Sequence, residues 1–179
     1  MSFDMKVMAA VYFSSIMIIT STEATHANGQ ESYADRYTKL EQVQKCVDDA
    51  KTRTEMQKCI GITYGDCISA TTGSRVAESW CLGENLSLIT SIYGGEVIKH
   101  FSKAQQSAEN PAADINIKQH LLSRVIEAEK KWDEYRKVQC EMEMTWYGAG
   151  NAVATAEPVC HARLYVDRIY QLKHGSLGR

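Results

Sequence analysis

Apolar side chains recur every three or four residues along most of this chain, which is the spacing of one face of an α-helix. Five segments follow this pattern, and no segment alternates in the way typical of a β-strand. The predicted helices cover 31–50, 52 to about 62, 74 to beyond 101, 121–142, and about 157–172. The sequence therefore predicts an all-α fold, a small helical bundle of about four to five helices.

Polar residues mark the starts of two of these helices. Thr52 and Glu55 have the spacing of a capping box, in which each side chain satisfies a free backbone N–H group of the first turn. Ser74 is placed to cap the third helix in a similar way. Between these two starts, turn residues over 64–73 predict a loop that carries Cys67.

Glycine and proline predict where the later helices bend or end. Gly94 and Gly95 each destabilise a helix by up to about 1 kcal/mol relative to alanine, so the third helix is expected to bend or break there. The segment 107–114 contains a proline and separates the third helix from the fourth. The glycine-rich segment 148–151 ends the fourth helix, and Pro158 fits the first turn of the last one.

The first 27 residues have the pattern of a secretory signal peptide rather than of a folded domain. Lys6 is followed by an uncharged, mainly apolar run over 7–20, which is shorter than the roughly 20 residues needed to span a bilayer. Small residues before Asn28 suit cleavage there, which leaves 28–179 as one domain. The alternative is an uncleaved N-terminal anchor, which Ser14 and Ser15 disfavour. No cysteine lies immediately after the expected cleavage site, where lipidation would need one, so we expect neither a lipid anchor nor another stable membrane anchor.

Charge excludes some classes of partner. The chain has 20 basic and 22 acidic side chains, and removing Asp4, Lys6 and Glu23 with the leader leaves a net charge of about −1. A nucleic-acid-binding domain needs a basic face, and binding to anionic lipid needs a polybasic patch. Neither pattern is present in the sequence, so we expect no nucleic-acid partner.

All six cysteines lie in the expected mature domain, at Cys46, Cys59, Cys67, Cys81, Cys140 and Cys160. An even number behind an export signal predicts disulfides, whereas a metal site would need C-x-x-C pairs or histidines at ligand spacing. We therefore expect no metal and no cofactor. Six cysteines allow 15 pairings. The helix plan favours 46–59, 67–81 and 140–160, because each pair then joins neighbouring elements and closes a short loop worth roughly 3 kcal/mol.

Two motifs are KCVDDAKTRTEMQKC over 45–59 and AEKKWDEYRKVQC over 128–140. Together they resemble the LprI-type lysozyme inhibitor family of secreted bacterial proteins. Glu55 and Met56 belong to the first motif. The second contains Trp132, Tyr135 and Arg136. It continues through the glycine-rich turn to Cys160, Leu164, Arg168 and Leu172. The resemblance covers most of 45–172. Family members usually have glutamine where Glu129 stands, and the pair Cys67 and Cys81 is additional.

The resemblance implies a periplasmic or secreted protein that blocks a peptidoglycan-hydrolysing lysozyme by protein–protein contact. A lysozyme acts with two carboxylates in a cleft, and a rigid loop with a polar or basic tip could block that cleft. The best candidate is the loop over 146–151, held by a Cys140–Cys160 disulfide. Its candidate contact residues are Trp146, Tyr147, Gly148 and Asn151. Alternatively, Trp146 closes the core at the helix end.

The remaining motif residues are expected to be structural. Trp132 and Tyr135 are three residues apart on the apolar stripe of the fourth helix and are expected in the core. Arg136 and Arg168 are each expected to pair with a carboxylate or a helix C-terminus.

No arrangement typical of an enzyme is present in the sequence. The histidines are isolated, and Glu141 and Glu143 are two residues apart on a helix, so they cannot face each other. Disulfides would leave no thiol as a nucleophile. We therefore expect a non-enzyme. The alternative to an inhibitor is a structural or stress-related envelope module that binds another periplasmic protein.

Overall fold

The described part of the chain is helical and contains no strand. The structure is a computed structural model, and it describes residues 33–71, 74–109, 115–148, 150 and 152–175. The predicted signal peptide lies outside these residues. Four helices are long: α2 (Tyr33–Asp49), α5 (Arg75–Glu109), α6 (Ile115–Tyr147) and α7 (Val153–His174). The short run α3 (Arg53–Lys58), η1 (Cys59–Gly61) and α4 (Ile62–Ser69) connects α2 to α5. The predicted all-α, disulfide-stapled bundle is confirmed.

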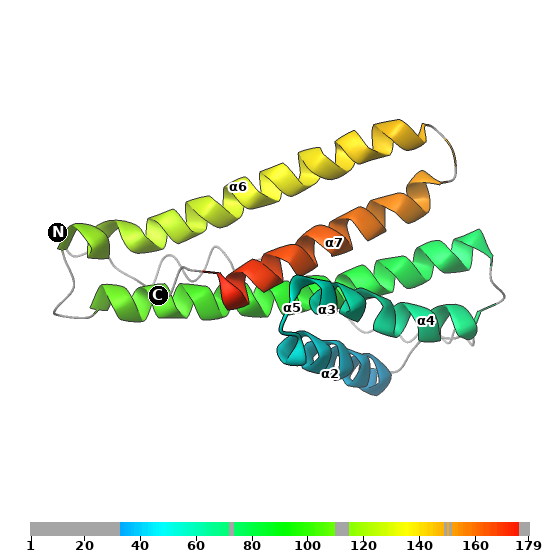
Figure 1. The fold of residues 1–179 in the computed structure, drawn as a ribbon, viewed down its shortest axis with the longest axis horizontal. Coiled ribbons are helices and arrows are strands. Elements are labelled where there is room, and N and C mark those ends of the chain that lie inside the picture. Colours follow the sequence, from blue (N-terminus) through cyan, green and yellow to red (C-terminus); the bar gives the residue numbers. More distant parts are fainter. Residues whose placement is uncertain (1–32, 72–73, 110–114, 149, 151, 176–179) are drawn as a thin grey trace, which may run out of the picture. The chain divides into compact units, whose positions relative to one another are not determined.

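Helix α5 is the centre of the packing, because it contacts α2, α4, α6 and α7. Helix α6 runs antiparallel to α5, and α7 runs antiparallel to α6, with which it is also in contact (Figure 1). Helix α7 additionally contacts the short α3. Figure 1 shows α2, α3 and α4 on the opposite side of α5 from α6. We call α2, α3, η1 and α4 together the arm, and α6 with α7 the hairpin. The arm and α6 thus lie on different sides of α5.

The main hydrophobic core lies between the arm, α5 and α7. Its fully or almost fully buried members come from α2, α3, η1, α5 and α7, together with Ala50. They are Val43, Val47, Ala50, Met56, Cys59, Ile89, Ile92, Ala162, Val166 and Ile169. Helix α6 contributes no member to this cluster. Burial of these side chains stabilises the fold by roughly 1.5–3 kcal/mol for each large aliphatic residue.

Three disulfides join consecutive elements in the favoured order. Cys46 pairs with Cys59, Cys67 with Cys81, and Cys140 with Cys160, and their Cα atoms are 5.8, 5.6 and 5.8 Å apart. No cysteine in the described residues is free. Such a set of cross-links is typical of an oxidising environment outside the cytoplasm. The favoured pairing from the helix plan is confirmed.

The turn between α2 and α3 is closed by the predicted capping box. Glu55 N donates to Thr52 Oγ1 at 3.1 Å, and Thr52 N donates to a Glu55 carboxylate oxygen at 3.2 Å. Backbone hydrogen bonds from Lys51 and Thr52 lower the pKa of Glu55. Ser74 also acts as expected, since Ala77 N donates to its hydroxyl at 3.2 Å.

Cys67 lies in a helix rather than in the predicted loop. It belongs to α4, which continues directly from η1 and includes Gly65. The tertiary contacts that hold this helix on α5 include the Cys67–Cys81 disulfide and a hydrogen bond from Thr63 to Asn85 at 2.7 Å. Local turn propensity therefore predicted the wrong structure here, because packing on α5 outweighs the effect of one glycine.

A break at Gly94 and Gly95, one of the two predicted outcomes, does not occur. Helix α5 runs without interruption from Arg75 to Glu109. Ile92 is buried in the core, and Tyr93 and Glu96 contact residues of other turns or helices. Burial of Ile92 and Glu96, on either side of the two glycines, favours a continuous helix. Helix α5 also extends two residues past the predicted start of the interruption at 107, and 110–114 lie outside the described residues.

Helix α7 begins at Val153, four residues before the expected start, so Pro158 lies inside it and not in its first turn. Proline has no N–H, so the carbonyl of Ala154, one turn earlier, loses its intrahelical donor. The Ser79 hydroxyl of α5 donates to that carbonyl at 3.2 Å. This tertiary hydrogen bond thus replaces the intrahelical one that Pro158 cannot donate.

Candidate functional site

The end of the α6–α7 hairpin exposes two aromatic side chains. Trp146 is 79% exposed and Tyr147 is 55% exposed, both in the last turn of α6. Gly148 follows with φ +66°, a left-handed conformation that ends helices and favours glycine. The alternative in which Trp146 closes the core is wrong. Asn151 lies outside the described residues, so its expected contact role stays a prediction.

This end is held by a disulfide and an ion pair between α6 and α7. The sulfurs of Cys140 and Cys160 belong to residues that are almost fully buried. Arg163 of α7 pairs with Glu143 of α6 one turn further along. The hairpin end is therefore cross-linked within two turns of Trp146, which restricts how far the exposed aromatic residues can move.

Arg136 is a buried junction between α6 and α7. It is only 8% exposed, and its guanidinium donates to Asp133 Oδ1 through Nε at 3.1 Å and through Nη2 at 2.7 Å. Its Nη1 lies 2.6 Å from Nδ1 of His161. Its Cζ lies 4.6 Å from the ring centroid of Tyr165. The expected pairing of Arg136 with a carboxylate is confirmed, and the arginine is structural.

The contact with Arg136 fixes the protonation of His161. A guanidinium can only donate, so Nδ1 accepts the hydrogen bond and the neutral ring carries its proton on Nε2. Burial, and then the positive charge of Arg136, lower the pKa of His161. Burial alone would raise the pKa of Asp133, but hydrogen bonds from Lys137 and Arg136 lower it. At neutral pH the junction therefore holds a cation, a carboxylate and an uncharged imidazole.

A pocket of about 500 Å³ lies beside this junction, between the end of α6 and the start of α7. Glu141 and Glu157 line it together with His161, and Gly148 borders it at the hairpin end. The sequence does not predict this pocket, because the residues that line it come from two helices and are brought together only by the packing of α6 on α7.

The middle of the hairpin packs on α5 through an aromatic cluster. The ring centroids of Tyr93, Trp132 and Tyr165 are 4.9 to 5.4 Å apart, with one ring from each of the three helices. Glu129 accepts a hydrogen bond from the Tyr93 hydroxyl at 2.9 Å and pairs with Arg168. Burial, and then the hydrogen bond to Glu129, raise the pKa of Tyr93. The expected pairing of Arg168 with a carboxylate is confirmed, and Trp132 is half-buried in this cluster.

The expectation that Tyr135 lies in the core is wrong. Its side chain is 56% exposed, and Met142 of the same expected stripe is 45% exposed. The apolar stripe of α6 is wider than the strip that α5 and α7 cover. The covered strip contains Trp132, Arg136 and Cys140, so part of the stripe faces outwards.

The two N-terminal motif residues have structural roles. Glu55 caps α3, as described above, and Met56 is fully buried in the main core. The arm is tied to α7 by Asp167, which accepts hydrogen bonds from Arg53 Nε at 2.6 Å and Gln57 Nε2 at 2.8 Å.

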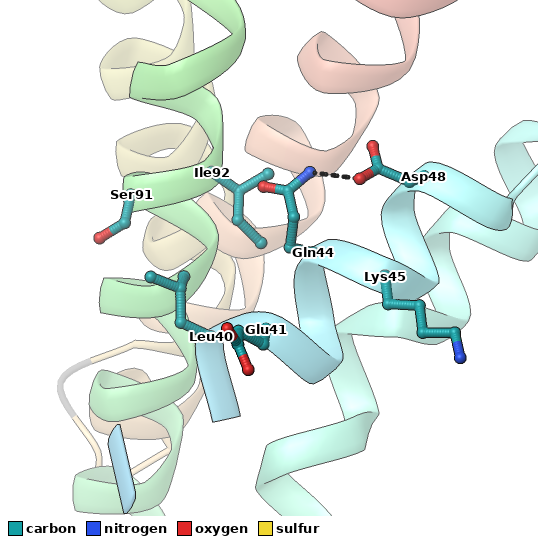
Figure 2. A pocket seen from close by; sticks show the side chains of 7 residues that line it. All are labelled: Leu40, Glu41, Gln44, Lys45, Asp48, Ser91 and Ile92. Carbon is teal, nitrogen blue, oxygen red and sulfur yellow. Dashed lines mark hydrogen bonds between the residues drawn. The ribbon is translucent and has the colours of Figure 1, made fainter. Parts of the chain in front are cut away.

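A second hollow of about 430 Å³ lies between α2 and α5. Figure 2 shows Leu40 and Ile92 together with polar side chains that include Glu41, Gln44 and Asp48. Gln44 donates to Asp48 at 3.1 Å, and Asp48 also pairs with Lys173 of α7. These side chains are engaged with each other and join α2 to α7, so this hollow is a weaker candidate than the hairpin end.

Comparisons with protein-family models, curated proteins and solved structures found no match. In the part of the chain that the structure describes, no group of three or more His, Cys, Asp or Glu side chains is arranged to hold a metal ion. No helix among the described residues has both the length and the apolar content to cross a bilayer.

Proposed function

We propose that this protein is a periplasmic or secreted binding protein without enzymatic activity, and that it inhibits a lysozyme through the α6–α7 hairpin end. The observation that carries the proposal is the exposure of Trp146 and Tyr147 beside a disulfide-linked pair of helices. Tryptophan and tyrosine are enriched among the residues that contribute most to protein interfaces. A pre-ordered contact surface also loses less conformational entropy on binding.

The resemblance of 45–59 and 128–172 to the LprI-type lysozyme inhibitor family supports the choice of partner. The three disulfides support the compartment, because they form and persist outside the cytoplasm. Lysozymes act on peptidoglycan in that same environment. The proposal thus combines a surface that suits a protein partner with a sequence pattern that suggests which partner it is.

The test is a cell-wall turbidity assay with oxidised protein and c-type, g-type and i-type lysozymes. We expect near-stoichiometric inhibition of at least one type. The variant Trp146→Ala/Tyr147→Ala should lose inhibition, by about tenfold or more if both residues are hot spots, while its thermal midpoint stays unchanged. Ile98→Ala on α5, at a residue 67% exposed, is the matched control and should inhibit normally.

Inhibition of no lysozyme type would reject the inhibitor function and favour the envelope module that binds another periplasmic protein. Inhibition that survives Trp146→Ala/Tyr147→Ala would keep the function but remove the hairpin end as its site.

A further inference from the structure

One face of α6 is apolar and uncovered. Tyr135, Val138, Met142 and Trp146 follow each other at three- and four-residue steps, so they line one side of the helix. They are 56%, 64%, 45% and 79% exposed. We call these four side chains the α6 apolar face. No helix in the described part of the chain buries it, and four large apolar side chains exposed in one row are typical of an interaction surface.

Carboxylates run beside this face. Glu134 and Glu141 are one helical step from Val138, on the adjacent strip of α6. Near the pocket, Arg136 and Lys137 both pair with Asp133, and Arg163 pairs with Glu143, whereas Lys130 and Lys131 lie further towards the start of α6. Among the described residues, Glu134 and Glu141 have no ion-pair partner. From Val138 to Tyr147, α6 has no basic side chain, so the unpaired charge at this end of the helix, on Glu141, is negative.

The pocket at the hairpin end adds another carboxylate to the same surface. Glu141 lines it from α6 and Glu157 lines it from α7. The nearest cationic candidate for Glu157 is His161, whose Nε2 is 3.9 Å away. His161 is uncharged at neutral pH, because burial and Arg136 lower its pKa. Lys137 also borders the pocket, but its ammonium donates to Asp133 at 2.8 Å. The pocket thus carries two carboxylates without a full counter-charge.

We propose that the α6 apolar face and this pocket form one docking surface for a cationic protein, with partner apolar side chains on the face and a partner lysine or arginine in the pocket. This inference rests on the proposed function and names the chemistry of the surface that the lysozyme presents. It differs from the sequence-based idea of a polar or basic tip that enters the carboxylate cleft. The described residues from Met144 to Gly148 contain no basic side chain that could enter an acidic cleft. Because Glu141 and Glu157 line the pocket beside them, the complementary surface of the partner is a basic one.

The first experiment measures the affinity for a c-type lysozyme by isothermal titration calorimetry at low and high salt. Glu141→Gln/Glu157→Gln removes both charges and keeps the shape of the pocket. We expect it to weaken binding by about tenfold and to flatten the salt dependence, because close interfacial charge pairs contribute strongly to affinity. Glu41→Gln/Glu127→Gln removes two exposed glutamates elsewhere and is the matched control, with unchanged affinity.

A second variant tests the apolar part. Val138→Ser/Met142→Ser should also weaken binding by about tenfold, but it should keep the salt dependence of the unmodified protein. The same lysozyme with its lysines acetylated should bind weakly to the unmodified protein. Equal affinities for all variants, at every salt concentration, would overturn the docking surface and leave the inhibitor function standing.

A peptide titration separates failure of the inference from failure of the proposed function. The amide resonances of Glu141, Thr145 and Glu157 are followed by NMR while an amidated Lys-Leu-Lys peptide is added, with Glu-Leu-Glu as the control. We expect shifts at these residues with the cationic peptide alone. Shifts without binding of any lysozyme would reject the inhibitor function and keep the docking surface. No shifts, or a concentration-dependent dimer that Val138→Ser/Met142→Ser abolishes, would overturn the docking surface.

Discussion

Cys46–Cys59 and Cys140–Cys160 each join two consecutive helical elements, with Cα atoms 5.8 Å apart in both. Around the first disulfide, Val43, Val47 and Met56 are buried almost completely in the main core. Around the second, Met142 and Trp146 are exposed. The two disulfides therefore have different surroundings. In the arm the disulfide lies beside the main core, and in the hairpin it lies beside exposed apolar side chains.

The difference follows from what lies next to each turn. The arm is short, and α5 and α7 enclose its apolar side chains. The apolar stripe of α6 is wider than the strip that α5 and α7 cover, and polar and aromatic groups hold the helix: Glu129, Trp132 and Arg136. Apolar residues of α6 beyond this strip, which include Met142 and Trp146, are exposed. Burial, and not the cross-link, decides which turn is structural.

The largest expected effect is on a buried methionine of the arm. Met56→Ala should lower the free energy of unfolding by about 4 kcal/mol, because it removes a fully buried side chain and leaves a cavity. Met142→Ala on the α6 apolar face is the matched control and should change it by less than about 1 kcal/mol. Denaturant titration measures both. Similar losses for the two variants would contradict the distinction between core and surface.

Removal of either disulfide should lower the free energy of unfolding by a similar amount, but the two removals should have different effects on the affinity for a lysozyme. Cys46→Ala/Cys59→Ala and Cys140→Ala/Cys160→Ala open loops of 13 and 20 residues, and each should lower the free energy of unfolding by about 3 kcal/mol. At a temperature where both variants stay folded, only the second should lose affinity for the lysozyme. Loss of affinity in both variants, or in neither, would argue against a separate binding end.

The capping box gives a smaller effect confined to the arm. Thr52→Ala removes the hydroxyl that accepts from Glu55 N and should destabilise the protein by about 1 kcal/mol. Inhibition and peptide binding should be unchanged, since the arm carries no part of the docking surface. Thermal unfolding and the turbidity assay together check this, with Thr54→Ala, a neighbouring threonine within α3, as the control.

The smallest expected effect is a pH dependence at the hairpin. The pKa of His161 in the folded protein lies below its ordinary value of 6.5, so near and below pH 6.5 the unfolded chain binds more protons. The stabilisation that depends on neutral His161 is complete above about pH 6.5 and is lost as the pH falls through the folded-state pKa. His161→Gln should flatten the slope of stability against pH from 7 to 5. A slope unchanged by this variant would show that other groups cause it.

Local patterns predicted much of the arm and little of the site. The capping box of Thr52 and Glu55 and the cysteine pairing are short-range features, and the structure contains them. The helix of Cys67 and the continuous α5 across Gly94 were missed, because contacts with other helices outweigh turn propensity there. Pro158 was placed in the wrong turn because Ser79, far away in the sequence, satisfies the carbonyl that proline leaves free.

The sequence by itself determined the helical class and the order of the helices, since these depend on spacing along the chain, and it favoured the sequential disulfide pairing that the structure contains. It also marked Trp146 and Tyr147 as candidate contact residues. Only the tertiary structure decided that Tyr135 and Met142 face outwards, that His161 meets Arg136, and that Glu141 and Glu157 share a pocket. The physical reason is that helical periodicity shows which residues share a face, whereas burial depends on how much of that face the neighbouring helices cover.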